Sequence, residues 1–268
     1  MLIDTHCHLS YPELHRQLGD VLARAQQAGV ARLITVATSP QDARLAVDIA
    51  RAHPQISFAA GVHPHEAAKV GDEDLQALAD LHRGRWRLGT LEERLAAVGE
   101  TGLDFHYDFA PRQRQEHVFR FQLALAVETG RPVIIHAREA ELRVCDILDE
   151  HPALAGRVVF HCFSKGPDVA RRILDAGNWL SFTGVLTFRN AAEVQASARM
   201  APADRIMIET DAPYLSPEPL RKVRPCEPAF VAHTARFLAA LRGEPPETLA
   251  ARTTQNAVRF FSLGSHAA

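Results

Sequence analysis

The sequence has few cysteines, and they are spread along the chain. They form no CxxC pair and no zinc-ribbon spacing: Cys7, Cys145, Cys162 and Cys226. A chain of 268 residues can bury a full core without disulfides or a structural metal. Free thiols are therefore the expected state of these cysteines, and free thiols are typical of a reducing cytoplasm. We expect a cytoplasmic location.

Long apolar runs are missing as well. No run approaches the roughly 18 residues that a membrane helix needs. The first residues, MLIDTHCH, have neither the charged nor the apolar region of a signal peptide. The sequence therefore predicts no contact with a membrane. It also has no GxSxG, P-loop or HExxH motif, so these common catalytic and phosphate-binding signatures are excluded.

Neither sign of charge dominates the sequence. The formal net charge is -2 at pH 7, and the isoelectric point is about 6.7. Such a chain has no overall basic field to attract nucleic acid. A nucleic-acid substrate would have to be held locally, by metal ions and a few arginine or lysine side chains.

Short, almost continuously apolar runs alternate with longer amphipathic stretches. Such runs, rich in Val, Ile and Phe, are typical of parallel strands that are buried on both faces. Strands are predicted at residues 2–9, 32–37, 56–62, 95–100, 132–137, 157–163, 179–184 and 205–211. Helices are predicted at residues 11–28, 40–52, 111–129, 138–150, 167–176, 190–199, 227–242 and 246–261, with a further helix and a loop (83–90) within 66–98.

Eight strands, each followed by helix, predict an α/β fold: a (β/α)₈ or TIM barrel that forms a single domain over residues 1–268. The alternative is a doubly wound open sheet. That fold usually has a glycine-rich phosphate turn after its first strand. Here the corresponding residues are DTHCH, which favours the barrel.

Side chains that can bind metals occur where the predicted strands end. In a TIM barrel the catalytic residues come from the C-terminal ends of several strands. The candidates at these ends are His6, His8, His63, His65, Glu100, His136, His161, Glu209 and Asp211. Other histidines, such as His82 and His266, fall on helices, loops or the tail, and we expect them to be surface or structural residues.

The alternation of side chains along a strand orients the first candidates. Residues two apart share a face of the strand. His6 and His8 are therefore expected to point into the barrel mouth, with Asp4 deeper on the same face. Cys7 is expected to point outward, toward the helices, and Cys162 is expected to turn away from the site in the same way.

Imidazole and carboxylate groups without thiolates suit zinc, manganese, iron or, with more carboxylate and water, magnesium. The candidate ligands outnumber what one catalytic zinc needs, so two divalent ions that share a bridging carboxylate are expected. Glu100 lies between two sets of histidines in the sequence and could form the bridge. Two such ions would lie roughly 3.5–4 Å apart.

Six segments of the chain resemble the TatD family of metal-dependent deoxyribonucleases. They are DTHCHL (4–9), GVHPH (61–65), GETGLDFHYD (99–108), PVIIHAREA (132–140), HCFSKG (161–166) and ETDAPYLSP (209–217). The resemblance covers nearly the whole chain, and the motifs are spaced as in the family. It implies a TIM barrel of the amidohydrolase-like superfamily that hydrolyses DNA phosphodiesters, often as a 3′-to-5′ exonuclease supported by magnesium.

The resemblance also implies roles for individual residues. It implies that two divalent ions are held by His6, His8, Glu100, His136, His161 and Asp211. It makes His63 a phosphate ligand and Glu209 a residue that supports a ligand or contacts substrate. In one place the chain departs from the family, because Pro225 and Cys226 replace the Arg-Asn of a short basic loop. That departure bears on the substrate preference.

The first functional hypothesis is a DNA phosphodiesterase that acts on single-stranded or frayed ends. A metal-bound hydroxide would attack phosphorus in line, and Asp211 would orient or deprotonate it. Lys165 and Arg221 are predicted substrate contacts, and a monomer is the expected oligomeric state. The alternatives are a small-molecule amidohydrolase or esterase on the same barrel and a non-catalytic metal-binding protein. Glu100 counts against the amidohydrolase, because many dinuclear amidohydrolases bridge their metals with a carboxylated lysine.

Overall fold

Eight parallel strands form one sheet in the computed structural model, which describes residues 1–264. Each strand pairs with its neighbours in the sequence. The strands are β1 (Leu2–Cys7), β2 (Val30–Ala37), β3 (Ile56–Ala60), β4 (Leu95–Asp104), β5 (Val133–Arg138), β6 (Val158–Phe160), β7 (Trp179–Phe182) and β8 (Ile206–Ile208). The sheet closes where the N–H of Asp211 donates to the carbonyl of His6 (2.8 Å) and the N–H of His8 donates to that of Ala212 (2.7 Å). The predicted TIM barrel is confirmed. The tail residue His266, predicted to be a surface or structural residue, lies outside the described residues.

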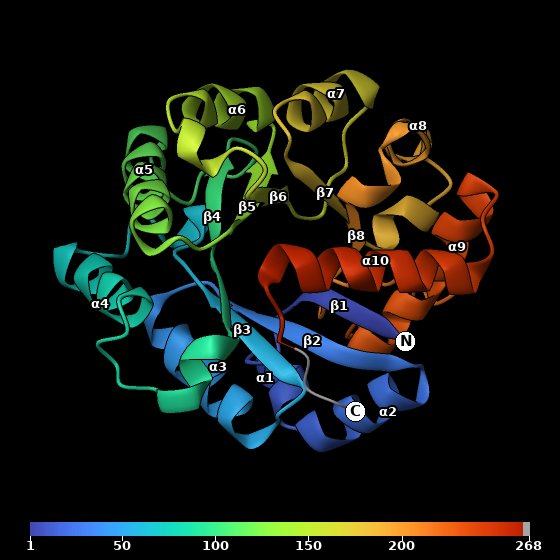
Figure 1. Ribbon diagram of the computed structural model, residues 1–268, viewed down its shortest axis with the longest axis horizontal. Coiled ribbons are helices and arrows are strands. Elements are labelled where there is room, and N and C mark those ends of the chain that lie inside the picture. Colours follow the sequence, from blue (N-terminus) through green and yellow to red (C-terminus); the bar gives the residue numbers. More distant parts are fainter. Residues whose placement is uncertain (265–268) are drawn as a thin grey trace.

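Helices surround the barrel (Figure 1). They are α1 (Pro12–His15), α2 (Leu18–Gln27), α3 (Pro40–Ala52), α4 (Asp72–His82), α5 (Arg112–Thr129), α6 (Glu141–Asp149), α7 (Pro167–Asp175), α8 (Ala192–Met200), α9 (Val231–Arg242) and α10 (Pro246–Phe261). The predicted single helix at 11–28 is wrong. It is two helices, because Gln17 leaves the helical conformation (φ -125°, ψ 31°) just before Gly19, a residue of low helix propensity.

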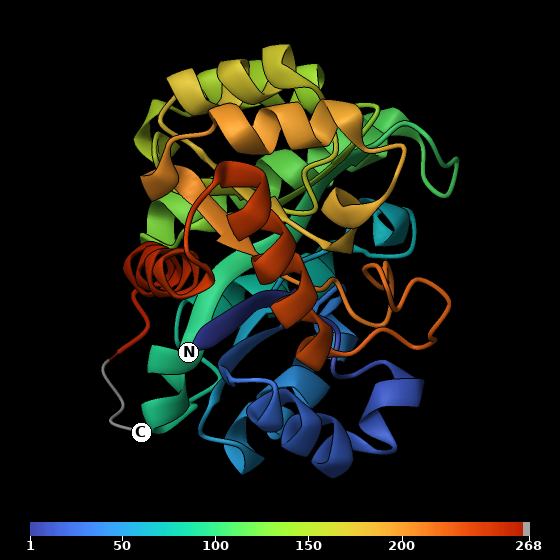
Figure 2. The same cartoon turned by 90° about the vertical axis from the view of Figure 1, so that its right-hand side faces the viewer.

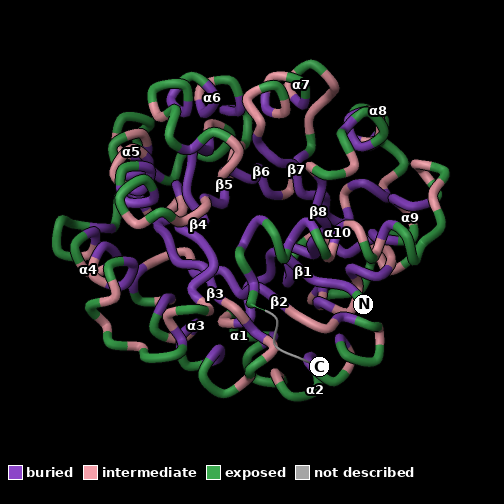
Figure 3. The backbone as a smooth tube through the Cα atoms, in the orientation of Figure 1, coloured by how far each residue is buried: buried purple, intermediate pink, exposed green. Residues whose placement is uncertain are grey.

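The two ends of the barrel differ in chemistry. At the N-terminal ends of the strands the interior is apolar, and Ile3 and Met207 belong to one buried cluster with Phe260 of α10. Helix α10 lies across this end (Figure 1), and the strands are mostly buried (Figure 3). The loops that follow the strands project from the opposite end, on the right in Figure 2. Within residues 1–264, no helix combines the length and the apolar character that a membrane span requires.

The fourth strand is longer than predicted. It was expected to end at Glu100, but β4 continues to Asp104. The Thr101-Gly102 pair looks like the start of a turn, yet Gly102 lies within the strand at a φ of +143°. A Cβ atom at this position would lie 2.0 Å from the carbonyl oxygen of His136, so only glycine allows β4 and β5 to approach so closely. The extension brings Asp104 to the barrel mouth.

The first strand does not alternate regularly. The register between β1 and β2 shifts between Asp4 and Cys7, and the shift breaks the two-residue periodicity from which the position of Asp4 was predicted. The carboxylate of Asp4 accepts hydrogen bonds from the N–H groups of His6 (3.3 Å) and Thr210 (2.9 Å) and from the Thr210 hydroxyl (2.6 Å). The prediction that Asp4 lies beneath His6 and His8 on one face is therefore wrong, and Asp4 instead ties β1 to the chain after β8.

His82, predicted to be a surface or structural residue, is buried on α4 and should make stability depend on pH. Its Nε2 faces the carbonyl oxygen of Ala60 at 2.9 Å, and burial lowers its pKa to about 4. In the unfolded chain the ring protonates near pH 6.5, so the stability that neutral His82 contributes is present above pH 6.5 and is lost as the pH falls toward 4. Between pH 7.5 and 5 the loss should be about 2 kcal/mol.

This prediction is checked by urea denaturation of the wild type and of His82→Gln, with chelator present throughout. Glutamine keeps an N–H donor for Ala60 but does not titrate. The free energy of unfolding of the wild type should fall more steeply than that of the variant between the two pH values. Parallel pH dependences of the two proteins would show that His82 does not bind protons on unfolding.

Candidate active site

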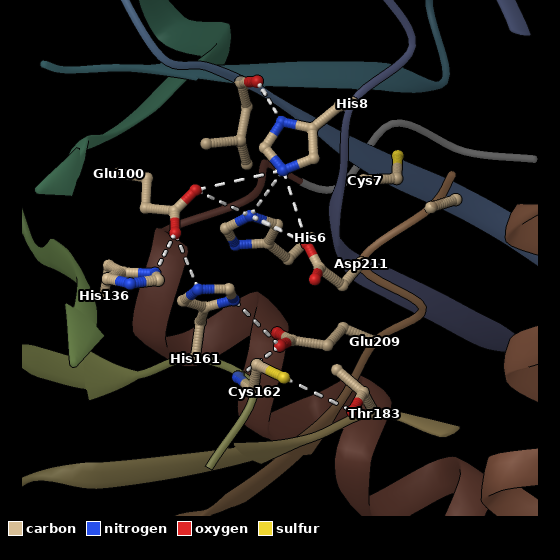
Figure 4. Close-up of polar contacts among 12 residues, drawn as sticks. His6, Cys7, His8, Glu100, His136, His161, Cys162, Thr183, Glu209 and Asp211 are labelled. Carbon is tan, nitrogen blue, oxygen red and sulfur yellow. Dashed lines mark hydrogen bonds and ion pairs between the residues drawn. The ribbon is translucent and has the colours of Figure 1, made fainter. Parts of the chain in front are cut away.

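Glu100 lies at the centre of the polar cluster in the barrel mouth, and its two oxygens face different partners (Figure 4). Its Oε2 lies 3.3 Å from Nε2 of His6 and 3.8 Å from Nε2 of His8. Its Oε1 lies 3.0 Å from Nδ1 of His136 and 2.7 Å from Nε2 of His161. The carboxylate is buried. It lies between two sets of nitrogen donors, one from β1 and the segment after it, the other from β5 and the end of β6.

The donors on the Oε2 side have the spacing that a metal ion requires. Nε2 of His6 and Nε2 of His8 lie 3.3 Å apart, and Oδ1 of Asp211 is 3.3 Å from His8 and 3.8 Å from His6. Four donors arranged tetrahedrally around a cation, with bonds of about 2.0–2.2 Å, lie about 3.3–3.6 Å from one another. This set therefore fits a small divalent cation, and it includes one oxygen of Glu100.

Three histidines of the cluster, His8, His136 and His161, also have a polar partner at the ring nitrogen that faces away from Glu100. Nδ1 of His8 faces the carbonyl oxygen of Val36 at 2.9 Å, so this nitrogen carries a proton and Nε2 is the nitrogen that faces the cluster. Nδ1 of His161 lies 3.3 Å from Glu209, and Nε2 of His136 lies 3.0 Å from Asp104. Histidine ligands of metals generally have such a carbonyl or carboxylate partner, which fixes the tautomer and the ring orientation.

The buried charges shift one another's pKa values. Burial would raise the pKa of Glu100, but the surrounding histidines, His161 first, hold it well below its usual value. Burial would likewise lower the pKa of His8, but the carboxylates of Asp211 and Glu100 raise it to about 9. Glu100 is thus ionised at neutral pH. A divalent cation would displace the proton from His8, so metal binding should release protons.

His63 lies at the edge of the cluster, where it was predicted to contact a phosphate. Its Nδ1 accepts a hydrogen bond from the N–H of His65 (3.1 Å), so a neutral ring carries its proton on Nε2. Nε2 lies 3.5 Å from Oε1 of Glu100. Burial, and then the charge of His136, lower the pKa of His63 well below its usual value. The side chain is therefore a neutral N–H donor that faces the site.

Glu209 is buried behind His161 and not in the mouth. One oxygen accepts from the N–H of Cys162 (2.6 Å), and the other accepts from the hydroxyl of Ser181 (2.6 Å). Of the two roles that the resemblance implied, these contacts favour the support of a ligand over contact with substrate. Cys162 lies beside this carboxylate, with its sulfur 3.5 Å from the hydroxyl of Thr183 (Figure 4).

Two further residues complete the cluster. Asp104 was missed because β4 was expected to stop at Glu100, and His65 was a strand-end candidate without an assigned role. Oδ2 of Asp104 lies 2.8 Å from Nε2 of His65 and 3.0 Å from Nε2 of His136. Asp104 is four residues from Glu100, and the period of two on a longer strand would have placed both carboxylates on the same face.

Asp104→Asn should weaken the site without removing a ligand. The variant loses the charge that holds His136, and its single oxygen cannot both face the imidazoles and accept from the N–H groups of His106 and Tyr107, as the two carboxylate oxygens do. Loss of such a partner typically costs 10–100-fold in metal affinity or activity, so we expect a loss of about tenfold in both. Calorimetric metal titration and turnover measurements check this. Wild-type metal affinity in Asp104→Asn would mean that the carboxylate does not orient His136.

The other predicted substrate contacts lie in the loops that follow β6 and β8. Nζ of Lys165 is 3.6 Å from Oε1 of Glu141, and the guanidinium of Arg221 lies 3.8 Å from the centre of the Phe188 ring. Cys226, at the departure from the family pattern, is fully buried, and its N–H donates to the carbonyl of Pro213 (2.9 Å). It therefore acts on the conformation of the loop after β8 and does not itself touch a substrate.

Known proteins are similar to this chain over nearly its full length. A model of the family described as TatD related DNase matches residues 3–262. The protein named uncharacterized metal-dependent hydrolase YabD, from Bacillus subtilis, is 37% identical over 98% of this chain and 100% of its own length. The protein named 3′-5′ ssDNA/RNA exonuclease TatD, from Cronobacter sakazakii, is 36% identical over 97% of each chain.

Solved structures agree with the sequence matches. The TatD homologue YjjV from Escherichia coli K12 has a TM-score of 0.90 and 29% identity, with 98% of each chain covered. A TatD family hydrolase from Entamoeba histolytica, at 19% identity, has a TM-score of 0.87 over 98% of this chain and 99% of its own, which shows the shared fold. On the match over residues 3–262 and the identities above 30% to full-length relatives, this chain belongs to the TatD-related DNase family of metal-dependent hydrolases.

Proposed function

We propose that the protein is a DNA phosphodiesterase that uses two divalent ions and removes nucleotides from the 3′ end of single-stranded DNA or frayed ends. The observation that carries the proposal is the position of Glu100, whose two oxygens face two separate sets of donors. A shared carboxylate between two cations is the arrangement of hydrolytic two-metal sites. The relative named as an exonuclease supports the choice of nucleic acid as substrate.

The ions would be held by His6, His8, Glu100, His136, His161 and Asp211. When bound, they would lower the pKa of water and neutralise the phosphate oxygens. Imidazole and carboxylate donors are compatible with magnesium, manganese or zinc. The donors of the Oε2 set are already 3.3–3.8 Å apart, whereas Oε1 is within hydrogen-bond distance of His136 and His161. The first set should therefore bind its ion more tightly.

The protein side chains would accept the proton of the attacking water and hold the phosphates of the substrate. The side chain of Asp211 is only 13% exposed, and hydrogen bonding to His8 helps to hold its pKa below the usual value, so it is ionised and can accept a proton from the attacking water. The Nε2–H of His63 would donate to a phosphate oxygen. Lys165 and Arg221 would contact phosphates farther along the strand.

The test is hydrolysis of a single-stranded oligonucleotide that carries a label at its 5′ end. The purified protein is stripped of metal and then supplied with magnesium, manganese or zinc one at a time. A ladder of products that shorten by one nucleotide from the 3′ end is the expected result. A 5′-phosphorylated duplex with blunt ends should be degraded more slowly, because its terminal bases are paired.

Three outcomes of this experiment would contradict the proposal. Hydrolysis of an ester or amide panel without any hydrolysis of DNA would assign the barrel to small-molecule chemistry. Products cut from the 5′ end would reverse the assigned direction. Metal binding without hydrolysis of either substrate class would leave a non-catalytic metal-binding protein. Elemental analysis of the active form gives the number of ions directly.

We also assign the protein to a reducing compartment such as the cytoplasm. The support is that its four cysteines are free and that three of them are buried, where they pack as small apolar residues. A monomer remains the expected form, and sedimentation of the purified protein would test it.

A further inference from the structure

The exposed aromatic side chains of this protein all lie at one end of the barrel. Within residues 1–264, only four Phe, Tyr or Trp residues are classed as exposed, at 36–61% exposure. They are Tyr11 in the loop after β1, Tyr107 and Phe109 after β4, and Tyr214 after β8. These loops follow the C-terminal ends of the strands and project to the right in Figure 2, and the metal-binding residues lie at the same strand ends. Single exposed apolar residues are common on protein surfaces, but a set confined to one mouth is typical of a binding site.

Two of these residues form the Tyr107 pair, Tyr107 with Phe109. Their ring centres are 5.4 Å apart. The ring of His65 lies 4.7 Å from Phe109 and 5.5 Å from Tyr107. His65 shares Asp104 with His136, a donor on the Oε1 side of Glu100. The Tyr107 pair therefore adjoins that side of the cluster.

The other two residues form the Tyr214 pair, Tyr11 with Tyr214. Their ring centres are 5.8 Å apart, and Tyr214 lies 6.3 Å from the ring of His8. His8 is a donor on the Oε2 side of Glu100. The two aromatic pairs consequently adjoin opposite sides of the metal-binding cluster, one beside each set of donors.

Cationic groups accompany the aromatic rings on the β4 side. The guanidinium of Arg138 lies 4.8 Å from the centre of the Tyr107 ring, and that of Arg112 lies 4.3 Å from the centre of the neighbouring Phe105 ring. Exposed rings together with guanidinium groups are the means by which proteins bind single-stranded nucleic acids, since a base stacks on the ring and the cation attracts the backbone.

We propose that the Tyr107 pair and the Tyr214 pair stack on the two nucleobases that flank the scissile phosphate. The proposal rests on the function proposed above, because it needs the phosphate to lie on the metal-binding cluster. A phosphodiester joins two nucleosides, and with the phosphate on the cluster one base lies on each side. A base that stacks on a protein ring must leave its own helix, so the two pairs would select single strands and frayed ends.

The test uses three single-stranded oligonucleotides in hydrolysis assays. One is intact, one has an abasic analogue in place of the 3′-terminal nucleoside, and one has it at the penultimate position. For the wild type, each abasic substrate should raise KM by about tenfold, which corresponds to the loss of one stacked base. Phe109→Leu should remove the response to one abasic position and keep the response to the other. Tyr214→Leu should show the opposite pattern.

Matched variants separate stacking from other effects. Leucine keeps an apolar side chain at position 109 without an aromatic face, whereas Phe109→Trp should restore or strengthen binding. Val258→Ala removes an exposed apolar group from α10, at the other end of the barrel, and should not change KM. Metal content, measured for every variant, should equal that of the wild type.

Several results would overturn the proposal. Equal KM increases for intact and abasic substrates in both variants would show that the rings do not contact the bases. A change of molecular mass in solution, with no change in KM, would show that the rings contact a second copy of the chain. If the wild type does not hydrolyse DNA, the proposed function fails. Fluorescence anisotropy with the same three oligonucleotides would then still show whether the mouth stacks on bases.

Discussion

Glu100→Gln is expected to lose metal binding and hydrolysis together, each by about 10³-fold. Two unit charges about 4 Å apart interact by about 4 kcal/mol at an effective dielectric constant of about 20, and this energy is worth about a thousandfold in a binding constant. Glutamine keeps the shape of the side chain but removes its charge from both sets of donors. Because the carboxylate faces His6 on one side and His161 on the other, both ions should be affected.

Metal stoichiometry decides whether Glu100 bridges the ions. A bridging carboxylate predicts that both sites weaken in Glu100→Gln, whereas a ligand of one ion predicts that one site keeps its affinity. Glu244→Gln is a suitable control, because Glu244 is also a paired carboxylate with little exposure but binds Arg242 and Arg252. That variant should lose stability and keep its metal. Two tightly bound ions in Glu100→Gln would refute the bridging role.

The barrel was predictable because its strands are buried on both faces and therefore have nearly continuous apolar sequences. The strand limits were less predictable. Residues 206–208 form β8, although the apolar run predicted a strand to Asp211, because Asp211 has a φ of +58° and leaves the extended conformation. The opposite error occurred at β4, where Gly102 looks like a turn residue but allows close strand contact. Pairing with the neighbouring strands determines where β4 and β8 end, and this pairing is not visible in a single sequence.

The candidate site was partly predictable, because its metal-binding side chains occur where the apolar strand sequences end. The other five predicted ligands do converge around Glu100, from strands that are far apart in the sequence. What the sequence could not provide is the second partner of each ring. Val36 supplies a backbone carbonyl to His8, and any residue type could have done so. The place of Asp4 was predicted wrongly, because a register shift within β1 is invisible in the pattern of side chains.

The aromatic residues at the mouth show a further limit of prediction from sequence. Tyr11, Tyr107 and Tyr214 are the only tyrosines of the chain, but their separation by about a hundred residues hides any relation. The barrel brings the loops after β1, β4 and β8 to one end (Figure 2). Their common location follows from the topology alone, once each tyrosine is assigned to the loop that follows a strand.

Asp211→Asn is expected to lower kcat by at least about 10²-fold, the scale on which loss of a general base acts, while metal affinity falls only modestly. Asparagine is the informative replacement for two reasons. It keeps an oxygen that can bind metal, and it tolerates the left-handed backbone at φ +58° better than most residues. Asp211→Ala would add backbone strain to the loss of the carboxylate, so its effects could not be separated.

The comparison of kcat with metal affinity distinguishes two roles for Asp211. Oδ1 is 3.3 Å from Nε2 of His8, so the side chain belongs to the Oε2 set of donors. As a ligand alone, Asp211 would lose metal affinity and activity in parallel, and saturating metal would restore turnover in Asp211→Asn. As a proton acceptor, it acts on the step in which water attacks, so turnover should stay low at saturating metal. Recovery of wild-type kcat in excess metal would therefore show that Asp211 only holds the ion and that another group accepts the proton.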